Sequence, residues 1–304
     1  MQSAFDLLNK ITKKKRSQAE LLEYLQPINP KLHDKLKGCA SYLLIREWIE
    51  SGETRLRNAN FCKRFQLCPA CAVRRGAKLA ENALPKITHL MAENSDLTPV
   101  MITLTVPNTK NLSDGLERLK MAFSAMMASR RKCLSNPDRN TPIEFCKVQG
   151  GIHSIKTTHK GKGWHPHLHI FALISDWIDR VELSKEFQRF GGGKIVDVRK
   201  VKEGENGLVS GLLEVLKYPT KFSDLTPEKR YEFWLGANST RLTDCFGNMR
   251  GLKIGDIDQD DLNLEGAYRD WVARWYHSRQ GYRLWKANAW DDANEEQEEP
   301  VPEP

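Results

Sequence analysis

Hydrophobic and polar positions between residues 99 and 173 follow the pattern of β-strands. Residues 99–105 form a β-prone run that ends before Pro107. Residues 143–157 are predicted to form a second strand, and a Lys/Gly turn at 160–163 leads into a further apolar segment. We therefore predict an antiparallel hairpin at the centre of a sheet.

Helical patterns surround this β-region. Composition or an apolar stripe predicts helices over residues 17–25, 70–89, 111–134, 181–190 and 208–217. Another helix is expected at about 41–51, and another strand at 194–201 after three glycines. The fold class expected is α+β, with a central antiparallel sheet, helices on one side of it, and a mostly helical N-terminal region.

Charge is distributed unevenly along the 304 residues. The formal net charge is +8, but the segment from Asp291 to Pro304 carries seven acidic residues and no basic ones. Without those seven charges the remainder has a net charge of +15. A basic body favours a polyanionic partner, because neutralised phosphates release counterions. The acidic, Pro/Glu-rich end is predicted to be disordered.

The chain has seven cysteines and no recognisable export signal or long apolar run. We therefore expect a cytoplasmic protein without a transmembrane helix and without disulfides. Cys133, Cys146 and Cys245 are expected to be ordinary buried or scattered cysteines.

Four of the cysteines could form a metal site. Cys62, Cys68 and Cys71 include one Cys-x-x-Cys pair, and Cys39 lies upstream. Four thiolates would give Zn²⁺ a closed, structural tetrahedral site. The alternative is a set of buried free cysteines. Arg74 and Arg75 follow the pair and suit contacts with DNA phosphates.

Histidines occupy every second position in the apolar segment after the turn. The sequence there is Gly-Trp-His-Pro-His-Leu-His-Ile-Phe, with His165, His167 and His169. Residues two apart on a strand point to the same face, so His167 and His169 could bind one divalent metal ion. The alternative is a surface histidine cluster beside a strand.

A third group of reactive side chains lies at the end of the last predicted helix. Glu214 and Tyr218 are four residues apart and share one helix face, and Pro219 disfavours helical geometry at Tyr218. Taken alone, this segment is better explained as a plain amphipathic helix, with Tyr218 half buried and Glu214 solvated.

Taken in order, three motifs resemble the HUH endonucleases, and most closely the replication initiators of small rolling-circle plasmids. These motifs are the Thr-Leu-Thr strand at 103–105, the Trp-His-Pro-His-Leu-His stretch, and the Glu-x-x-Lys-Tyr-x-x-Lys segment from Glu214 to Lys221. They cover about residues 99–225. Some initiators and related transposases also carry an N-terminal cysteine module, so the resemblance extends more weakly to that region.

The resemblance implies a nicking and rejoining reaction. Tyr218 would attack phosphorus, form a 5′-phosphotyrosine and free a DNA 3′-OH. A divalent metal, Mg²⁺ or Mn²⁺, on the histidines would polarise the phosphate. Lys221 or Lys217 would pair with the phosphate, and Glu214 would direct water in a second cleavage that ends replication.

One position departs from the family pattern. A third metal ligand, often a carboxylate, comes from the neighbouring strand in these enzymes, and the matching position here is Lys156. His165 has the same parity as the other two histidines and is our first choice for the third ligand. Two imidazoles favour Mn²⁺ on ligand softness.

The expected domains are residues 1–95, a helical cysteine (zinc) module; 96–225, the HUH catalytic domain; and 226–304, a C-terminal extension. The implied partners are plasmid origin DNA, single-stranded at the nick, with a host helicase and DNA polymerase. The sequence has no Gly-x4-Gly-Lys-Ser/Thr motif for a helicase of its own.

Three other functions fit part of the sequence. An HUH transposase or relaxase would use the same chemistry, although relaxases usually place the tyrosine before the histidines. A non-catalytic, zinc-dependent nucleic-acid-binding regulator would use only the cysteine module and the basic surface. A metal-dependent hydrolase of another ester would leave no protein–DNA adduct.

Overall fold

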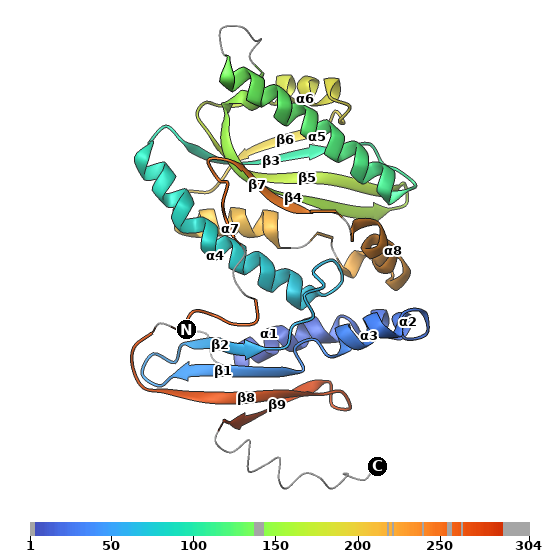
Figure 1. Cartoon of the computed structure of the whole chain (residues 1–304), viewed down its shortest axis with the longest axis vertical. Helices are drawn as coiled ribbons and strands as arrows, with labels where there is room; N and C mark the ends of the chain where they lie inside the picture. Colours follow the sequence, from blue (N-terminus) through green and yellow to red (C-terminus); the bar gives the residue numbers. More distant parts are fainter. Residues whose placement is uncertain are drawn as a thin grey trace. The chain divides into compact units, whose positions relative to one another are not determined.

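The computed structural model describes residues 4–136, 143–217, 219–220, 222–238, 240–253, 257–262 and 264–287. These residues divide into two compact units (Figure 1). The first unit holds residues 4–64, 68–71 and the described residues from 257 to 287, and the second holds 65–67 and the described residues from 72 to 253. This division differs from the boundaries predicted after residues 95 and 225, and the functional domain assignment stays a prediction.

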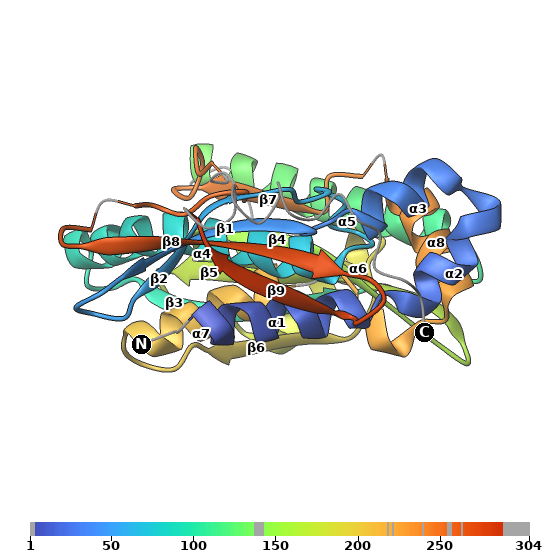
Figure 2. The ribbon, with the colours of Figure 1, turned by 90° about the horizontal axis from the view of Figure 1, so that it is seen from below.

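The first unit combines helices from the N-terminal region with strands from both ends of the chain. Its helices are α1 (Ala4–Arg16), α2 (Ala19–Ile28) and α3 (Pro30–Lys37). Its sheet has the order β2-β1-β8-β9, formed by β1 (Tyr42–Trp48), β2 (Thr54–Ala59), β8 (Tyr268–Tyr276) and β9 (Gly281–Lys286). All of its strand pairs are antiparallel, and β8 and β9 lie side by side in Figure 2.

The helix predicted at about 41–51 is wrong, because β1 occupies this position. Leu43 and Ile45 alternate with less buried residues and are fully buried on one face of the sheet. Leu43 pairs with Ala273, about 230 positions later in the sequence. On its other side β1 pairs with the nearby β2, so only the distant partner is without a local signal in the sequence.

The second unit is built on a five-stranded antiparallel sheet with the order β6-β3-β5-β4-β7. The strands are β3 (Thr98–Thr105), β4 (Val148–Lys160), β5 (Gly163–Ile174), β6 (Val196–Lys200) and β7 (Thr243–Gly247). The predicted hairpin is confirmed as β4–β5, and β5, which carries the histidines, is the central strand. The strand predicted over 143–157 begins later, because Glu144–Lys147 forms a short 3₁₀ helix.

Four helices of the second unit match predicted segments closely, and a fifth, over residues 227–237, has no predicted counterpart. They are α4 (Pro69–Glu93), whose first turn belongs to the first unit, α5 (Leu112–Ser135), α6 (Arg180–Arg189), α7 (Glu205–Leu216) and α8 (Pro227–Ala237), with a 3₁₀ turn at Phe222–Asp224. No helix among the described residues is long and apolar enough to cross a membrane.

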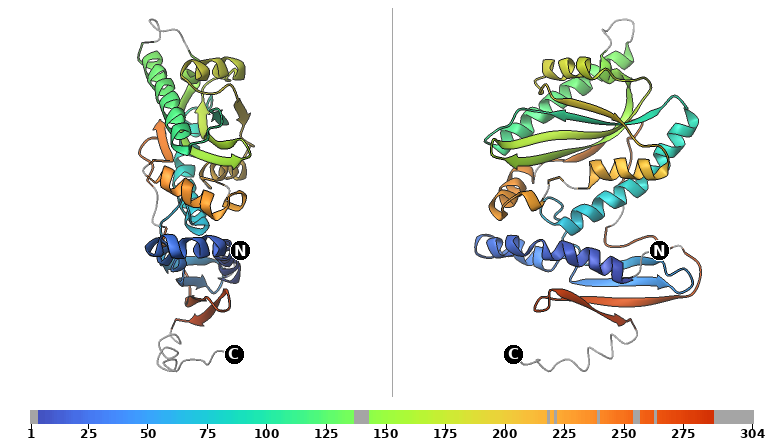
Figure 3. Two further views of the ribbon diagram at one scale, coloured as in Figure 1. Left: turned by 90° about the vertical axis from the view of Figure 1, so that its right-hand side faces the viewer. Right: turned by 180° about the vertical axis from the view of Figure 1, so that it is seen from behind.

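Helices pack on both faces of the five-stranded sheet, so the expectation of helices on one side is wrong. Leu104, Leu168 and Ile170 face the side covered by α5 and α6. Phe171 and Leu173 face the side covered by α4 and α7. Figure 3, left, shows α5 along one side of the sheet. The reason lies in β5, whose residues Ile170–Ile174 are buried on both faces and therefore need cover on both.

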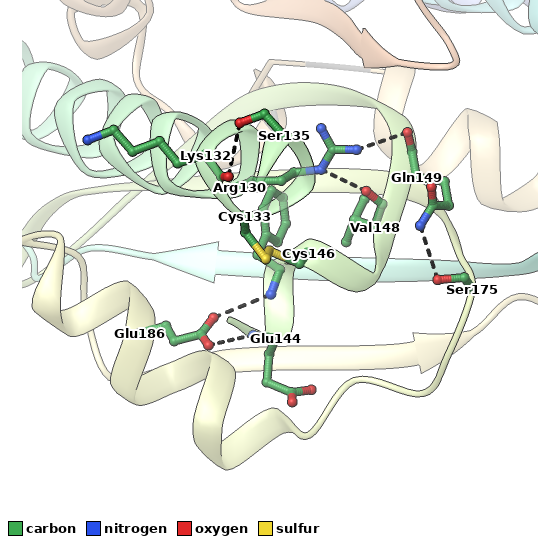
Figure 4. The surroundings of a disulfide bond; sticks show 11 residues. Arg130, Lys132, Cys133, Ser135, Glu144, Cys146, Val148, Gln149, Ser175 and Glu186 are labelled. Carbon is green, nitrogen blue, oxygen red and sulfur yellow. Dashed lines mark hydrogen bonds between the residues drawn. A yellow bond between two sulfur atoms is a disulfide. The ribbon is translucent and has the colours of Figure 1, made fainter. Parts of the chain in front are cut away.

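The structure also corrects the expectation that no disulfide forms. A disulfide joins Cys133 near the end of α5 to Cys146 in the 3₁₀ helix before β4 (Figure 4). Nearby, the Glu186 carboxylate accepts backbone hydrogen bonds from Glu144 and Phe145, and Arg130 donates to the carbonyl of Val148. The two cysteines are 13 positions apart, and only the packing of α5 on the sheet brings them together.

Candidate active site and cysteine cluster

The three histidines of β5 lie on one face of the central sheet, as the alternation predicted. Leu168, between His167 and His169, is buried on the other face, where it belongs to the core under α5. The ring centroids of His165 and His167 are 5.5 Å apart, and those of His167 and His169 are 5.0 Å apart. The histidines therefore share one face of the sheet with Phe171 and Leu173, which lie further along β5 under α4 and α7.

Hydrogen bonds orient two of these rings. Nδ1 of His167 donates to the carbonyl oxygen of His165 at 3.0 Å, and Nδ1 of His169 lies 3.4 Å from the hydroxyl of Thr103. The His167 bond fixes the tautomer in which Nε2 carries the lone pair, which is a metal-binding form.

Burial keeps the rings neutral. It lowers the pKa of His167 to about 4, and burial together with the positive charge of Lys156 lowers the pKa of His169 to about 3. Both imidazoles are therefore uncharged near pH 7, as metal coordination requires.

Lys156 lies directly opposite His167 in the β4–β5 register, at the position where the family pattern has a third ligand. Its ammonium donates a hydrogen bond to the backbone carbonyl of Glu214. Burial lowers the pKa of Lys156 to about 8, an effect that the carboxylate of Glu214 opposes. The neighbouring strand therefore contributes a cation at this position and no carboxylate.

A cavity of about 680 Å³ opens in front of these side chains. Its walls include His167 and His169 from β5, Lys156 from β4, and Glu214 and Lys217 from α7 and its C-terminal cap. The cavity thus brings together four predicted site residues, His167, His169, Glu214 and Lys217. Lys156, which stands where a third metal ligand was expected, lines the same cavity. A larger hollow of about 830 Å³ lies beside α4 and the start of α7 and contains none of the predicted catalytic or metal-binding residues.

Further polar groups in this region had no signal in the sequence. Arg199 of β6 donates to the Glu214 carboxylate at 3.1 Å and to Asp197 at 2.7 Å. Thr157 and Thr220 also line the cavity. Their hydroxyls are buried and have no hydrogen-bond partner among the described residues. Buried hydroxyls of this kind fit a site that binds a polar ligand.

Tyr218 and Lys221 lie outside the described residues. The described residues next to them in sequence, Lys217 and Thr220, both line the cavity. The amide of Thr157 on β4 donates to the carbonyl oxygen of Pro219 at 2.9 Å, which fastens this segment to the sheet.

His165 is not gathered into a three-ligand set. Among the described residues, only a group of cysteines brings three or more potential metal ligands within 4.8 Å of one another. His165 does not line the cavity, and its buried Nδ1 has no described partner. Its role as third ligand stays a prediction.

The four predicted cysteines meet in the first unit. The donor atoms of Cys39, Cys62, Cys68 and Cys71 all lie within 4.8 Å of one another. Sulfur atoms of neighbouring pairs are 3.5–3.6 Å apart. The edge of a tetrahedron with Zn–S bonds of about 2.3 Å is about 3.8 Å, so the arrangement fits a zinc ion.

Neighbouring groups favour negative charge on the sulfur of Cys68. Gln18 donates to the sulfur of Cys68 at 3.3 Å, and the amide of Cys62 lies 3.4 Å from the sulfur of Cys39. Hydrogen bonds among the cysteines hold the pKa of Cys68 well below its usual value and raise those of Cys39 and Cys71, so that the cluster without a metal carries its negative charge on Cys68. Lys15 of α1 is buried and donates to the carbonyl of Cys39, so its charge offsets that of the thiolates.

The chain directly after two of the cysteines is held in a strained conformation. Ala40 and Lys63 have positive φ values of 51° and 57°. Tyr282 of β9 donates to the carbonyl oxygen of Ala40 at 2.5 Å, and the amide of Ala40 donates to Asn60 at 2.9 Å. Non-glycine residues take this conformation only where their surroundings impose it, as a bound metal would.

Comparison with known proteins assigns the segments that form the histidine cavity to a protein family. The model of a family described as replication protein matches residues 53–282. The chain belongs to the replication protein family. The match includes Cys62, Cys68 and Cys71, the histidine strand and the segment with Glu214 and Tyr218, and it supports initiation of rolling-circle plasmid replication as the function of the chain.

Curated relatives carry the same description. A protein named "Protein rep" from Bacillus sp is 30% identical over 228 residues, which cover 66% of this chain and 69% of the relative. A "Protein rep" from Lentilactobacillus hilgardii is 23% identical over 308 residues, covering 90% and 94%. One from Bacillus amyloliquefaciens is 29% identical over 278 residues, covering 78% and 77%. No solved structure gives a significant match.

Proposed function

We propose that this replication protein starts plasmid replication by binding the origin, cutting one DNA strand with Tyr218 as the nucleophile, and rejoining it at termination. The observation that supports the proposal is the cavity in which His167, His169, Lys156, Glu214 and Lys217 converge beside the segment that contains Tyr218. An HUH transposase or relaxase, or a non-catalytic zinc-dependent regulator, is the alternative.

In the first step the phenolic oxygen of Tyr218 attacks phosphorus and the bond from phosphorus to the 3′ oxygen breaks. The phenol loses its proton to a base, and the leaving 3′ oxygen takes up a proton, which gives a 3′-OH and a 5′-phosphotyrosine. Because the ester keeps the energy of the broken bond, rejoining needs no ATP. The free 3′-OH would prime the host DNA polymerase, and a host helicase would unwind the duplex.

His167 and His169 would hold a divalent metal, Mg²⁺ or Mn²⁺, which when bound would supply positive charge for the scissile phosphate. The neutral rings and the fixed tautomer of His167 fit this role. Even with His165 as a third protein ligand, coordination positions would remain for water and phosphate oxygens. The DNA itself would therefore complete the metal site, and metal affinity should rise when DNA binds.

Cationic side chains in the cavity would share the task of neutralising the phosphate. Lys217 lines the cavity and is exposed, and the ammonium of Lys156 faces it from the sheet. A lysine ammonium acts on a phosphate as a point charge. We also propose Lys221 as a phosphate contact, from the motif alone.

Glu214 would orient or deprotonate water in the second cleavage. Its carboxylate is held by Arg199 at 3.1 Å, at the edge of the cavity. Because Glu214 is about half exposed, water can reach it. A single tyrosine followed by a water-directed cleavage suits an enzyme that acts once at each end of a replication cycle.

The test is a covalent-adduct assay on a denaturing gel. Full-length protein is mixed with Mn²⁺ and a labelled single-stranded origin oligonucleotide, beside the Tyr218→Phe variant. We expect a shifted protein–DNA band that the variant lacks. A band that the variant keeps would move the nucleophile elsewhere. Intact DNA binding without any adduct would favour the zinc-dependent regulator.

A further inference from the structure

A second cavity, of about 150 Å³, lies on the same face of the central sheet as His167 and His169. Its polar walls come from the start of α4 and its preceding loop, from β4, and from the loop that leads into β7. These polar residues are Gln66, Arg75, Ser154, Thr240, Arg241 and Thr243. All of them belong to the second unit.

Arg75 is the chemically unusual group in this cavity. Its guanidinium lies over the ring of Phe65 at 5.0 Å and donates to the Thr243 hydroxyl at 3.4 Å. Burial lowers its pKa, and the positive charge of Arg241 lowers it further. Among the described residues, no carboxylate forms an ion pair with Arg75, whereas Arg241 pairs with Asp244 at 2.9 Å. A largely desolvated guanidinium without an acidic partner costs free energy that a bound anion would offset.

The other groups of the cavity indicate the kind of anion. The hydroxyls of Ser154 and Thr243 lie 3.3 Å apart, beside the planar fork of Arg75. This set offers donors without a carboxylate, which suits phosphate oxygens. The volume fits one phosphate group of a nucleic-acid backbone and is too small for a whole nucleotide.

One short segment separates this cavity from the histidine cavity. Leu216 and Pro219 line the Arg75 cavity, whereas Lys217 and Thr220 line the histidine cavity. Gly76, next to Arg75, fixes the spacing, because a Cβ there would lie 2.7 Å from the carbonyl oxygen of Leu216. Helix α4 can therefore approach the end of α7 closely and place Arg75 beside the wall shared by the two cavities.

We infer that the Arg75 cavity binds a non-reacting phosphate of the same DNA strand whose neighbouring phosphate is cut at the histidine cavity. This inference rests on the proposed function for the position of the cut, but the phosphate contact can be tested without cleavage. Anchoring a second phosphate fixes the register of the strand, so that one phosphate alone meets the nucleophile.

The experiment measures binding of single-stranded oligothymidylate as a function of salt concentration. Arg75→Met should weaken binding about tenfold and reduce the slope of log K against log salt by about 0.7, the value for one lost contact with a single strand. Arg75→Lys should keep most of the slope. Arg189→Met is the matched control, because it removes one exposed arginine from α6 on the opposite face of the sheet. A folded Arg75→Met protein with the wild-type slope would overturn the inference.

A second measurement changes the DNA and uses the wild-type protein. Once the adduct assay has located the cut, each phosphate near it is replaced in turn by a neutral methylphosphonate. The inference expects one sensitive phosphate besides the scissile one, and uniform tolerance would overturn it. A Tyr218-dependent adduct together with an unchanged slope in Arg75→Met would remove this inference alone. A reduced slope without any adduct would remove the nicking proposal and keep the phosphate site.

Discussion

The cysteine cluster and the histidine cavity both gather metal-binding side chains, but they do so in opposite ways. The cluster supplies four soft donors within 4.8 Å of one another, three of them buried, with a buried lysine beside them. The cavity supplies two imidazoles on one strand, an opposing lysine and open space in front. A closed tetrahedral set stabilises a fold, whereas an incomplete set beside a cavity leaves room for a substrate.

The largest expected effect comes from opening the cysteine cluster. The Cys68→Ser variant should no longer bind zinc, and its first unit should no longer unfold in a cooperative transition. The reason is that zinc binding contributes on the order of 10 kcal/mol to folding of such sites. Metal analysis by mass spectrometry and a thermal melt monitored by circular dichroism would measure both. Cys245→Ser is the control, since Cys245 lies in β7 of the other unit. Wild-type protein without bound zinc would show that the cluster is a set of free thiols, and unchanged zinc content in Cys68→Ser would show that zinc is held elsewhere.

A change in the histidine cavity is expected to reduce activity and to leave zinc content and stability unchanged. His167→Ala should reduce the rate of adduct formation about a hundredfold or more, because the metal contributes several kcal/mol to stabilising the transition state. Zinc content and melting temperature should stay close to those of the wild type. A quench-flow or gel time course with Mn²⁺ measures the rate. If zinc were lost in this variant, the distinction between a structural and a catalytic site would fail.

A substitution at Lys156 can add a third ligand to the proposed metal site of His167 and His169. Lys156→Glu replaces a cation with a carboxylate opposite His167 and should raise Mn²⁺ affinity about tenfold in the absence of DNA. Isothermal titration calorimetry measures this affinity. Lys162→Glu makes the same charge change in the turn of the same hairpin and should leave Mn²⁺ affinity unchanged. Equal affinity in the two variants would show that position 156 does not face the metal.

The remaining prediction separates the effect of burial from that of metal binding. The ring of His153 of β4 lies 5.0 Å from the ring of Phe123, on the sheet face opposite to His167 and His169, and burial lowers its pKa to about 4. Because the unfolded chain binds this proton at about 6.5, the free energy of unfolding falls as pH drops from 6.5 towards 4, by up to about 3 kcal/mol.

His153→Leu should remove this part of the acid sensitivity and leave stability above pH 7 nearly unchanged. Urea unfolding at several pH values would measure it. The exposed His89 of α4, changed to Gln, serves as the control. Identical pH profiles for wild type and His153→Leu would contradict the assigned cause.

The sequence by itself determined the elements with strong local patterns. Alternating residues fixed β5 and the shared face of its histidines, and apolar stripes fixed α4, α5 and α7. The Cys-x-x-Cys spacing of Cys68 and Cys71 was sufficient to single out the cysteines that could hold a metal. These features depend on periodicity within a few residues, which is visible in any single chain.

Tertiary structure alone decided which distant residues meet. The strands β8 and β9 join β1 in one sheet, Cys133 meets Cys146, and Lys15 reaches the cysteine cluster from another helix. Arg199 and Arg75 acquire their surroundings only through strand order and the close approach of α4 to α7. Such contacts depend on packing between segments far apart in sequence, for which the local order of residues carries no signal.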